Sequence, residues 1–228
     1  MREIILDTET TGLSPAQGHR IIEIGCVELF NHIPTGKFFH AYVNPDRDVP
    51  EISTKITGLT AEFLKPYPTF DKIVHDLLAF IADDPLVIHN AEFDMAFLNA
   101  ELNRVNLPQL PKSRAVDTLM MARLKFPGSP ASLDALCKRF NIDLSKRDKH
   151  GALLDSELLA QVYLELLGGR QRSLGLSESQ EETLIEVETI KADYPMRNFE
   201  VTVEENSMHE AFLSQIKFPL WKKYLISE

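Results

Sequence analysis

Hydrophobic and polar residues alternate over much of the first 45 positions, a pattern that predicts β-strands. Residues 2–7 form a short apolar run typical of a buried strand, which then enters a turn-rich stretch from Thr10 to Gly18. Residues 20–30 alternate over a longer, largely buried strand. A turn-like stretch over 31–36 and a renewed strand over 37–43 predict a hairpin.

From Phe70 onward the apolar residues recur at helical spacing. The spacing predicts one short buried strand over 85–89 and five helices: one over 70–81, one around 93–102, one over 119–124, one that starts at Ser132 as N-cap, and one over 153–167. Strands followed by alternating helices and strands are typical of an α/β domain with a mixed sheet.

The composition divides the chain into three parts. Residues 1–168 carry the α/β pattern and form the predicted first domain. Residues 169–198 include a stretch rich in serine and glutamate, which predicts a flexible linker. Hydrophobic residues return in 199–228, a segment too short to fold alone.

Length and composition are those of an ordinary globular protein. The chain has 228 residues, of which 44% are hydrophobic and 25% charged. No apolar run approaches the ~18 residues that span a bilayer, and the first residues lack the features of a signal peptide. Cys26 and Cys137 stand far apart, which predicts buried thiols in a reducing compartment. We therefore expect a cytoplasmic protein.

The net charge leaves nucleic-acid binding open. A charge of −10, taken alone, argues against a nucleic-acid partner, because phosphate contacts need cations. Divalent ions held by carboxylates would reverse the local charge and attract phosphate.

Four acidic residues lie at the ends of predicted elements. Asp7 and Glu9 stand two positions apart at the end of a buried strand, so both point to one face. Asp94 follows the next strand, and Asp155 lies in the first turn of the last helix. Each acid alone is also explained as a solvated residue or as a first-turn acid favoured by the helix dipole. Together, on what could be one edge of a sheet, they indicate a shared site.

The chemistry of these four side chains favours a hard metal ion. Oxygen ligands without a cluster of Cys or His select Mg²⁺ or Mn²⁺ over zinc. A pair of such ions would activate water and stabilise both the attacking and the leaving oxygen in phosphodiester cleavage.

His150 precedes Asp155 by five residues, a spacing that turns the two side chains apart on a helix. We therefore place His150 in the loop before the helix, together with Lys146, Arg147 and Lys149. A loop histidine can serve as general base at neutral pH, and an exposed histidine without a role is the alternative. The basic neighbours would contact the substrate backbone or be merely solvated.

Three segments resemble, in order, the motifs of the DEDD exonuclease superfamily in its histidine-bearing (DEDDh) branch. They are residues 6–13 (LDTETTGL), 89–94 (HNAEFD) and 150–155 (HGALLD). The resemblance covers residues 1–168 and implies an RNase H-like fold with a mixed five-stranded sheet, 3′→5′ exonuclease activity and two catalytic metal ions. It also implies that the metal is held by Asp7, Glu9, Asp94 and Asp155, with His150 as the base.

Within that branch the chain is similar to the epsilon proofreading subunits of bacterial DNA polymerase III. The similarity rests on residues 18–25 (GHRIIEIG), 132–137 (SLDALC) and 150–155. It implies removal of unpaired 3′ DNA ends as nucleoside monophosphates. The expected substrate contacts are Asp7, Glu9, Thr10, Glu51, Thr57, His89 and Asp155.

Two positions depart from or add to the family pattern. Epsilon subunits commonly carry a histidine where this chain has Thr57, so the sugar-side contacts, for which Glu51 is a further candidate, stay open. The second motif adds an acid, Glu92, beside Asp94, and its effect on metal binding is also open.

The C-terminal part resembles partner-binding segments of the same subunit. Residues 171–176 resemble the peptide that grips the sliding clamp (beta), with contacts from Gln171, Ser173, Leu174 and Leu176. Residues 199–221 resemble the segment that docks on the polymerase alpha subunit, with contacts from His209, Phe212, Leu213 and Trp221. A C-terminal element packed on its own domain is the alternative. A small theta-like subunit is a further expected partner.

Two other functions are alternatives to a DNA exonuclease. A related exoribonuclease that trims RNA would need no polymerase anchor, so the C-terminal resemblance argues against it. A non-catalytic module that bridges clamp and polymerase would not need all five catalytic residue types.

Overall fold

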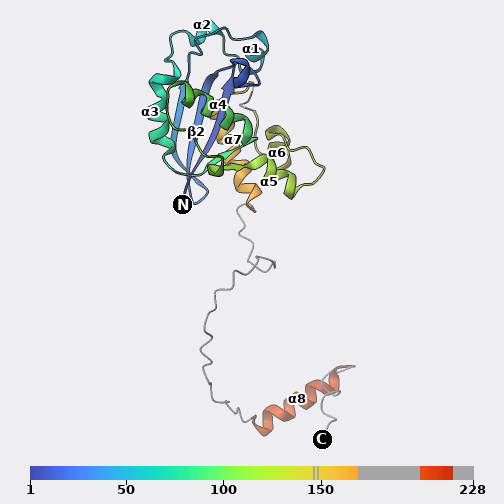
Figure 1. Cartoon of the computed structure of the whole chain (residues 1–228). Coiled ribbons are helices and arrows are strands. Elements are labelled where there is room, and N and C mark those ends of the chain that lie inside the picture. Colours follow the sequence, from blue (N-terminus) through green and yellow to red (C-terminus); the bar gives the residue numbers. More distant parts are fainter. Residues whose placement is uncertain (146, 148, 169–200, 218–228) are drawn as a thin grey trace. The chain divides into compact units, whose positions relative to one another are not determined.

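The computed structural model describes residues 1–145, 147, 149–168 and 201–217, which belong to two units, 1–177 and 178–228. The first unit contains one five-stranded sheet in the order β3-β2-β1-β4-β5 (Figure 1). The strands are β1 (Arg2–Thr10), β2 (Ile21–Phe30), β3 (Ile33–Tyr42), β4 (Leu86–Ile88) and β5 (Ala115–Asp117). Strands β1 to β3 are antiparallel, and β4 and β5 run parallel to β1, so the predicted mixed sheet is confirmed.

Helices α3 to α7 confirm the five helices that the periodicity predicts. The α-helices are α1 (Glu51–Thr57), α2 (Ala61–Leu64), α3 (Phe70–Ile81), α4 (Ala91–Arg104), α5 (Thr118–Lys125), α6 (Leu133–Arg139), α7 (Ala152–Leu166) and, in the second unit, α8 (Val203–Gln215). The sequence patterns missed three short segments, α1, α2 and β5, because a short segment shows too little of a period for reliable recognition. Across the described residues, every helix is too short or too polar to span a bilayer.

Two hydrophobic layers cover the two faces of the sheet. Strand β1 sends Ile4 and Leu6 into the layer formed with α3 and α4, and Ile5 into the layer formed with α5, α6 and α7. This alternation follows from the two-residue period of a strand. Cys26 is buried in the first layer and Cys137 in the second, which confirms the prediction of buried thiols.

The hairpin between β2 and β3 is tighter than the sequence predicted. The turn has only two residues, Asn31 and His32, with φ of 50° and 66°, so the predicted loop over 31–36 is wrong. The residues that suggested a loop, Pro34 and Gly36, lie within β3, where the register shifts and Gly36 has φ of 85°. An edge strand tolerates both in such an irregularity, because its outer backbone groups need no partner.

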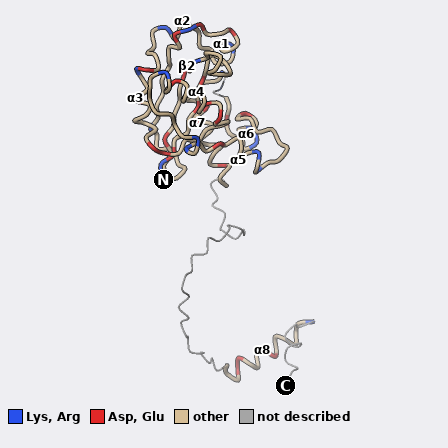
Figure 2. The backbone as a smooth tube through the Cα atoms, in the orientation of Figure 1, with Lys and Arg blue, Asp and Glu red and all other residues tan. Residues whose placement is uncertain are grey.

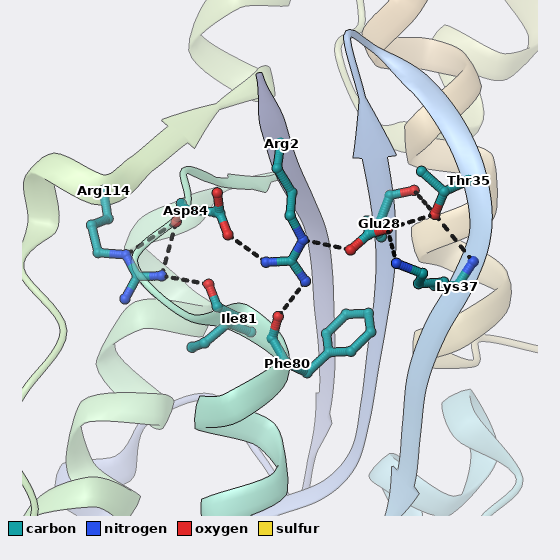
Figure 3. A network of polar contacts seen from close by, with 8 residues as sticks. All are labelled: Arg2, Glu28, Thr35, Lys37, Phe80, Ile81, Asp84 and Arg114. Carbon is teal, nitrogen blue, oxygen red and sulfur yellow. Dashed lines mark hydrogen bonds and ion pairs between the residues drawn. The ribbon is translucent and has the colours of Figure 1, made fainter.

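A polar network fastens the start of β1 to its surroundings (Figure 3). The Arg2 guanidinium pairs with Glu28 on β2 and with Asp84 before β4, and it donates to the carbonyl oxygen of Phe80 over 2.6 Å. Arg114, just before β5, donates to the carbonyl oxygen of Asp84 over 2.8 Å. These contacts join β1, β2 and the residue before β5 to the α3–β4 connection, at the end of the sheet where β1 begins.

Candidate active site

Strand β1 carries Asp7 and Glu9 on the face of the sheet that α7 covers. The sequence had suggested that this strand ends at Asp7. It continues to Thr10, so Asp7 lies within the strand. Asp7 lies opposite Gly25 of β2, and Glu9 lies opposite Glu23. β1 is the central strand of the sheet, but it pairs with β4 only at Ile4 and Ile5, so both carboxylates lie past that pairing, beside β2.

Helix α7 brings Asp155 to this face through close packing on β2. A Cβ atom at Gly25 would lie 2.3 Å from the backbone carbonyl carbon of Ala152, so the helix backbone rests directly on the glycine. The Ser156 hydroxyl donates to the carbonyl oxygen of Gly25 over 2.9 Å. Asp155, in the first turn of α7, is thereby buried with only 3% of its surface exposed.

The first turn of α4 supplies Asp94, which is fastened to β1. The backbone N–H and the hydroxyl of Thr8 donate to Asp94 Oδ1 over 3.0 and 2.6 Å. The start of the helix is fixed in turn by Asp117, whose carboxylate accepts from the backbone N–H groups of Asn90 and Ala91, each over 3.2 Å. The C-terminal ends of β1, β4 and β5 therefore position the acidic group together.

Burial raises the pKa of Asp7, Glu9 and Asp94, and repulsion between neighbouring acids adds to the rise for Asp7 and Glu9. Burial, then repulsion from Asp94, Glu9 and Asp155, raises the pKa of Asp7 well above its ordinary value. Burial, then repulsion from Asp155 and Glu23, raises the pKa of Glu9 to about 8. Burial raises the pKa of Asp94 to about 7, although the hydrogen bonds from Thr8 lower it. A cation is needed to keep such a group ionised at neutral pH.

His150 lies in the loop before α7, as predicted, and its side chain is 47% exposed. Its backbone N–H donates to the carbonyl oxygen of Ile56 in α1 over 3.2 Å. Its Nδ1 lies 3.3 Å from Asp155 Oδ2, and ligand atoms of Glu9, His150 and Asp155 all fall within 4.8 Å of one another. Such a cluster of carboxylate and imidazole groups fits a divalent cation.

Two cavities open beside the acidic group. The first, of about 540 Å³, is lined by Asp7, Asp155, His150, His89 and, among others, Arg123 and Arg147. The second, of about 420 Å³, is lined by Glu9 together with Thr10, Thr57, His19 and apolar side chains that include Leu13, Ile52, Ile56 and Phe93. The acids thus face both a polar and a largely apolar cavity.

Three expected substrate-side residues have partners of their own. Glu51 is exposed and pairs with Lys55 over 3.3 Å, and it lines neither cavity. The Thr57 hydroxyl donates to the carbonyl oxygen of Ser53 and accepts from the backbone N–H of Leu59. The Thr10 hydroxyl donates to the carbonyl oxygen of Gly12 over 2.7 Å. Their roles toward substrate stay predictions.

His89 and Glu92, both from the second motif, line different cavities. His89 lines the first cavity, where its Nδ1 is 2.9 Å from the Thr118 hydroxyl, and burial lowers its pKa. Glu92 is exposed and lines a separate cavity with Lys112 and Asp117. It therefore faces away from the group around Asp7.

Two residues next to the site have contacts that the sequence did not predict, Glu23 and Arg147. Glu23 is buried opposite Glu9, and the Nε2 of His40 lies 2.7 Å from its carboxylate. A glutamate inside a buried strand is the signal that could have revealed it. Arg147, expected either to contact the substrate backbone or to be merely solvated, instead binds Asp155 through two contacts of 2.6 and 2.7 Å.

The expected partner contacts are only partly within the described residues. Outside the described residues lie the clamp-binding residues Gln171, Ser173, Leu174 and Leu176, the polymerase-binding residue Trp221, and Lys146 of the loop before α7. In the second unit, α8 begins with a capping box between Thr202 and Glu205. On this helix His209 and Phe212 are exposed and Leu213 is buried.

Comparison with known proteins identifies the family. The exonuclease family (RNase_T) matches residues 4–163. The DNA polymerase III subunit epsilon of Rickettsia typhi is 50% identical over 225 residues, which cover 95% of this chain and 97% of that protein. The same subunit of Escherichia coli is 40% identical over 230 residues, covering 95% and 93%.

Solved structures support the fold. The nuclease domain of 3′hExo, described as a DEDDh family member bound to rAMP, matches with a TM-score of 0.63 at 21% identity, over 75% of this chain and 94% of that one. Exonuclease X, solved with 5′ overhanging duplex DNA, matches with a TM-score of 0.58 at 24% identity, over 72% and 90%. The chain belongs to the exonuclease family and, within it, to the DNA polymerase III epsilon subunits.

Proposed function

We propose that this chain is the proofreading 3′→5′ exonuclease of a bacterial DNA polymerase III and removes nucleotides from unpaired 3′ DNA ends. The observation that carries the proposal is the convergence of Asp7, Glu9, Asp94 and Asp155 from β1, α4 and α7. The similarity to epsilon subunits over 95% of the chain supports DNA as the substrate.

The four carboxylates fit divalent metal ions, and metal dependence is a property of the family. We assign Asp7, Glu9, Asp94 and Asp155 as the groups that hold two ions, and Mg²⁺ or Mn²⁺ as the ions, because the acids offer hard oxygen donors. When bound, these ions supply positive charge that activates water and stabilises charge on the attacking and leaving oxygens.

The remaining chemistry falls to the chain itself. His150, exposed beside Asp155, takes the proton from the attacking water. The apolar cavity beside Glu9, lined by Ile52, Ile56 and Phe93, receives the terminal base without reading its identity. A mismatched end frays at lower cost than a paired one. A site that accepts only single strands therefore removes mismatched ends in preference to paired ones.

The charge distribution supports a role for the ions in substrate attraction. Lysine and arginine are interspersed with aspartate and glutamate along the first unit (Figure 2), and the whole chain carries a net charge of −10. Attraction of phosphate to the acidic group therefore depends on cations held there.

We further propose a division of the chain into an exonuclease domain (1–168), a clamp-binding peptide with linker (169–198) and a polymerase-docking segment (199–228). The alpha subunit, the sliding clamp and a theta-like subunit are the proposed partners, in the cytoplasm at the replisome. The resemblance of the C-terminal sequence to such segments, and the exposed Phe212 on α8, support the docking role.

The test is digestion of 5′-labelled primers by the full chain, alone and with the alpha subunit. We expect faster removal of a mismatched than of a matched DNA end, slower digestion of RNA of the same sequence, and loss of activity in EDTA. Asp7→Asn and Asp155→Asn should abolish turnover, whereas Asp83→Asn, an exposed acid before β4, should not. Retained hydrolysis in both site variants would refute the assignment.

A further inference from the structure

Arg147 places a guanidinium against one member of the acidic group, Asp155. Its side chain is only 8% exposed, and it lines the same cavity as Asp7 and His150. Its Nε and Nη2 donate to the two carboxylate oxygens of Asp155 over 2.6 and 2.7 Å. Its Nη1 pairs with Asp134 of α6. One guanidinium therefore links two acids, one buried and one half-exposed.

The same guanidinium also reaches the proposed base. Arg147 Nη2 lies 2.8 Å from His150 Nδ1. A guanidinium can only donate hydrogen bonds, so Nδ1 accepts and a neutral imidazole carries its proton on Nε2. In this arrangement neither ring nitrogen is free to take a proton from water, and both oxygens of Asp155 are engaged.

We propose that Arg147 is an internal counter-ion that pairs with Asp155 while no metal is bound, and that it releases Asp155 and keeps only its pairing with Asp134 when a divalent cation binds. The inference rests on the proposed metal site. Buried acids without a cation repel one another, so a resident guanidinium stabilises the fold before metal arrives. The second anchor, Asp134, is 51% exposed and lies outside the carboxylate group, so it can retain the arginine after the exchange.

A counter-ion and a residue that only positions Asp155 predict opposite changes in metal affinity when Arg147 is removed. A counter-ion competes with the metal for Asp155, so its removal tightens metal binding. A brace that only positions Asp155 would favour metal binding, so its removal would weaken it. Loss of Asp134 should weaken metal binding, because Arg147 then has no second carboxylate to pair with when it releases Asp155.

The test is calorimetric titration of Mn²⁺ into the full chain at pH 7.5, without nucleic acid. We expect Arg147→Gln to bind Mn²⁺ about tenfold more tightly than the wild type, a factor that corresponds to about 1.4 kcal/mol. Asp134→Asn should bind severalfold more weakly, and most of that loss should vanish when Arg147→Gln is also present. Arg123→Gln is the matched control, since Arg123 lines the same cavity but makes no ion pair within the described part of the chain.

Thermal unfolding gives a second readout if a variant folds poorly. Arg147→Gln should melt below the wild type in EDTA, and saturating Mn²⁺ should remove most of the difference. Equal or weaker Mn²⁺ binding by Arg147→Gln, or a melting difference that Mn²⁺ leaves unchanged, would overturn the counter-ion role alone. Absence of Mn²⁺ binding by the wild type would instead refute the metal site itself, and the inference with it.

Discussion

Gly25 of β2 is in direct contact with the backbone of Ala152 in α7, because a Cβ atom at Gly25 would come within 2.3 Å of that backbone. Gly25 is also the register partner of Asp7. The distance between the helix and the sheet, and with it the distance between Asp155 and Asp7, is therefore set by the missing side chain of one residue.

Gly25→Ala should destabilise the protein and impair the site. The new methyl group meets helix backbone, which cannot rotate away, so α7 must shift and carry Asp155 with it. We expect a loss of roughly 1–3 kcal/mol in the free energy of unfolding, typical of an overpacked core, together with weaker Mn²⁺ binding. Urea unfolding and metal titration measure the two effects.

Gly151→Ala is the matched control for this change. Gly151 precedes α7 with extended backbone (φ −153°), and a Cβ there has its nearest contact at 4.0 Å, with Glu23. It should unfold at nearly the wild-type urea concentration. If the Gly25 variant were equally stable, the close approach of α7 would not constrain the site.

The stability of the metal-free protein should fall as pH rises from about 4.5 to about 8. The pKa of Glu9 is raised from 4.5 to about 8, so between these values the folded state holds a proton that the unfolded state has lost. The stabilisation is full below pH 4.5 and is lost as pH rises through 8. Unfolding measured in EDTA across this range tests the slope.

Glu9→Gln should flatten that slope by close to one proton, whereas the exposed Glu51→Gln should leave it unchanged. Added Mn²⁺ should stabilise the wild type more at pH 8 than at pH 6, because the ion replaces protons on the carboxylates. A slope that is identical in wild type and Glu9→Gln would argue against a shared, proton-holding group.

His150→Ala should leave a weak, metal-dependent nuclease. Loss of a general base lowers kcat by about 10²–10⁴, while the carboxylates that hold the metal remain. Rates at saturating DNA from pH 6 to 9, compared with His75→Ala on the exposed side of α3, measure the effect. Equal rates for His150→Ala and wild type over this range would remove His150 from the base role.

The Arg2–Glu28 pair should contribute to stability except in strong acid. The hydrogen bond from Arg2 lowers the pKa of Glu28 from 4.5 to about 2, so its stabilisation is present above pH 4.5 and is lost as pH falls toward 2. Arg2→Met should cost about 1.5–3 kcal/mol at pH 7, as for hydrogen bonds to charged groups.

Lys37→Met is the comparison for this pair. Lys37 also contacts Glu28, over 3.3 Å, but its side chain is 73% exposed, so its loss should cost far less. Equal costs for the two variants, or a cost for Arg2→Met that does not fall between pH 4.5 and 2, would contradict a stabilising role for the Arg2–Glu28 pair.

The sequence was most informative where patterns are long. The twelve residues of α3 have the spacing of Phe70, Ile73, Val74 and Leu77, and the structure has the helix over the predicted residues. Segments of three to seven residues show too little of a period to be recognised reliably: β4 and α6 were predicted, whereas β5 and α1 were missed. Pro34 and Gly36 misled the turn prediction, because the backbone freedom that suggests a loop serves a strand irregularity here.

The sequence by itself determined which acids and which histidine belong to the motifs, because their spacing along the chain is visible without coordinates. Only the tertiary structure decided how close they come. The approach of Asp155 to Asp7 depends on Gly25, and the position of Asp94 depends on Thr8. The pairing of Arg147 with Asp155 likewise depends on the path of a loop. Such contacts arise from packing between separate segments or from the path of a loop, and the order of residues along one segment does not encode them.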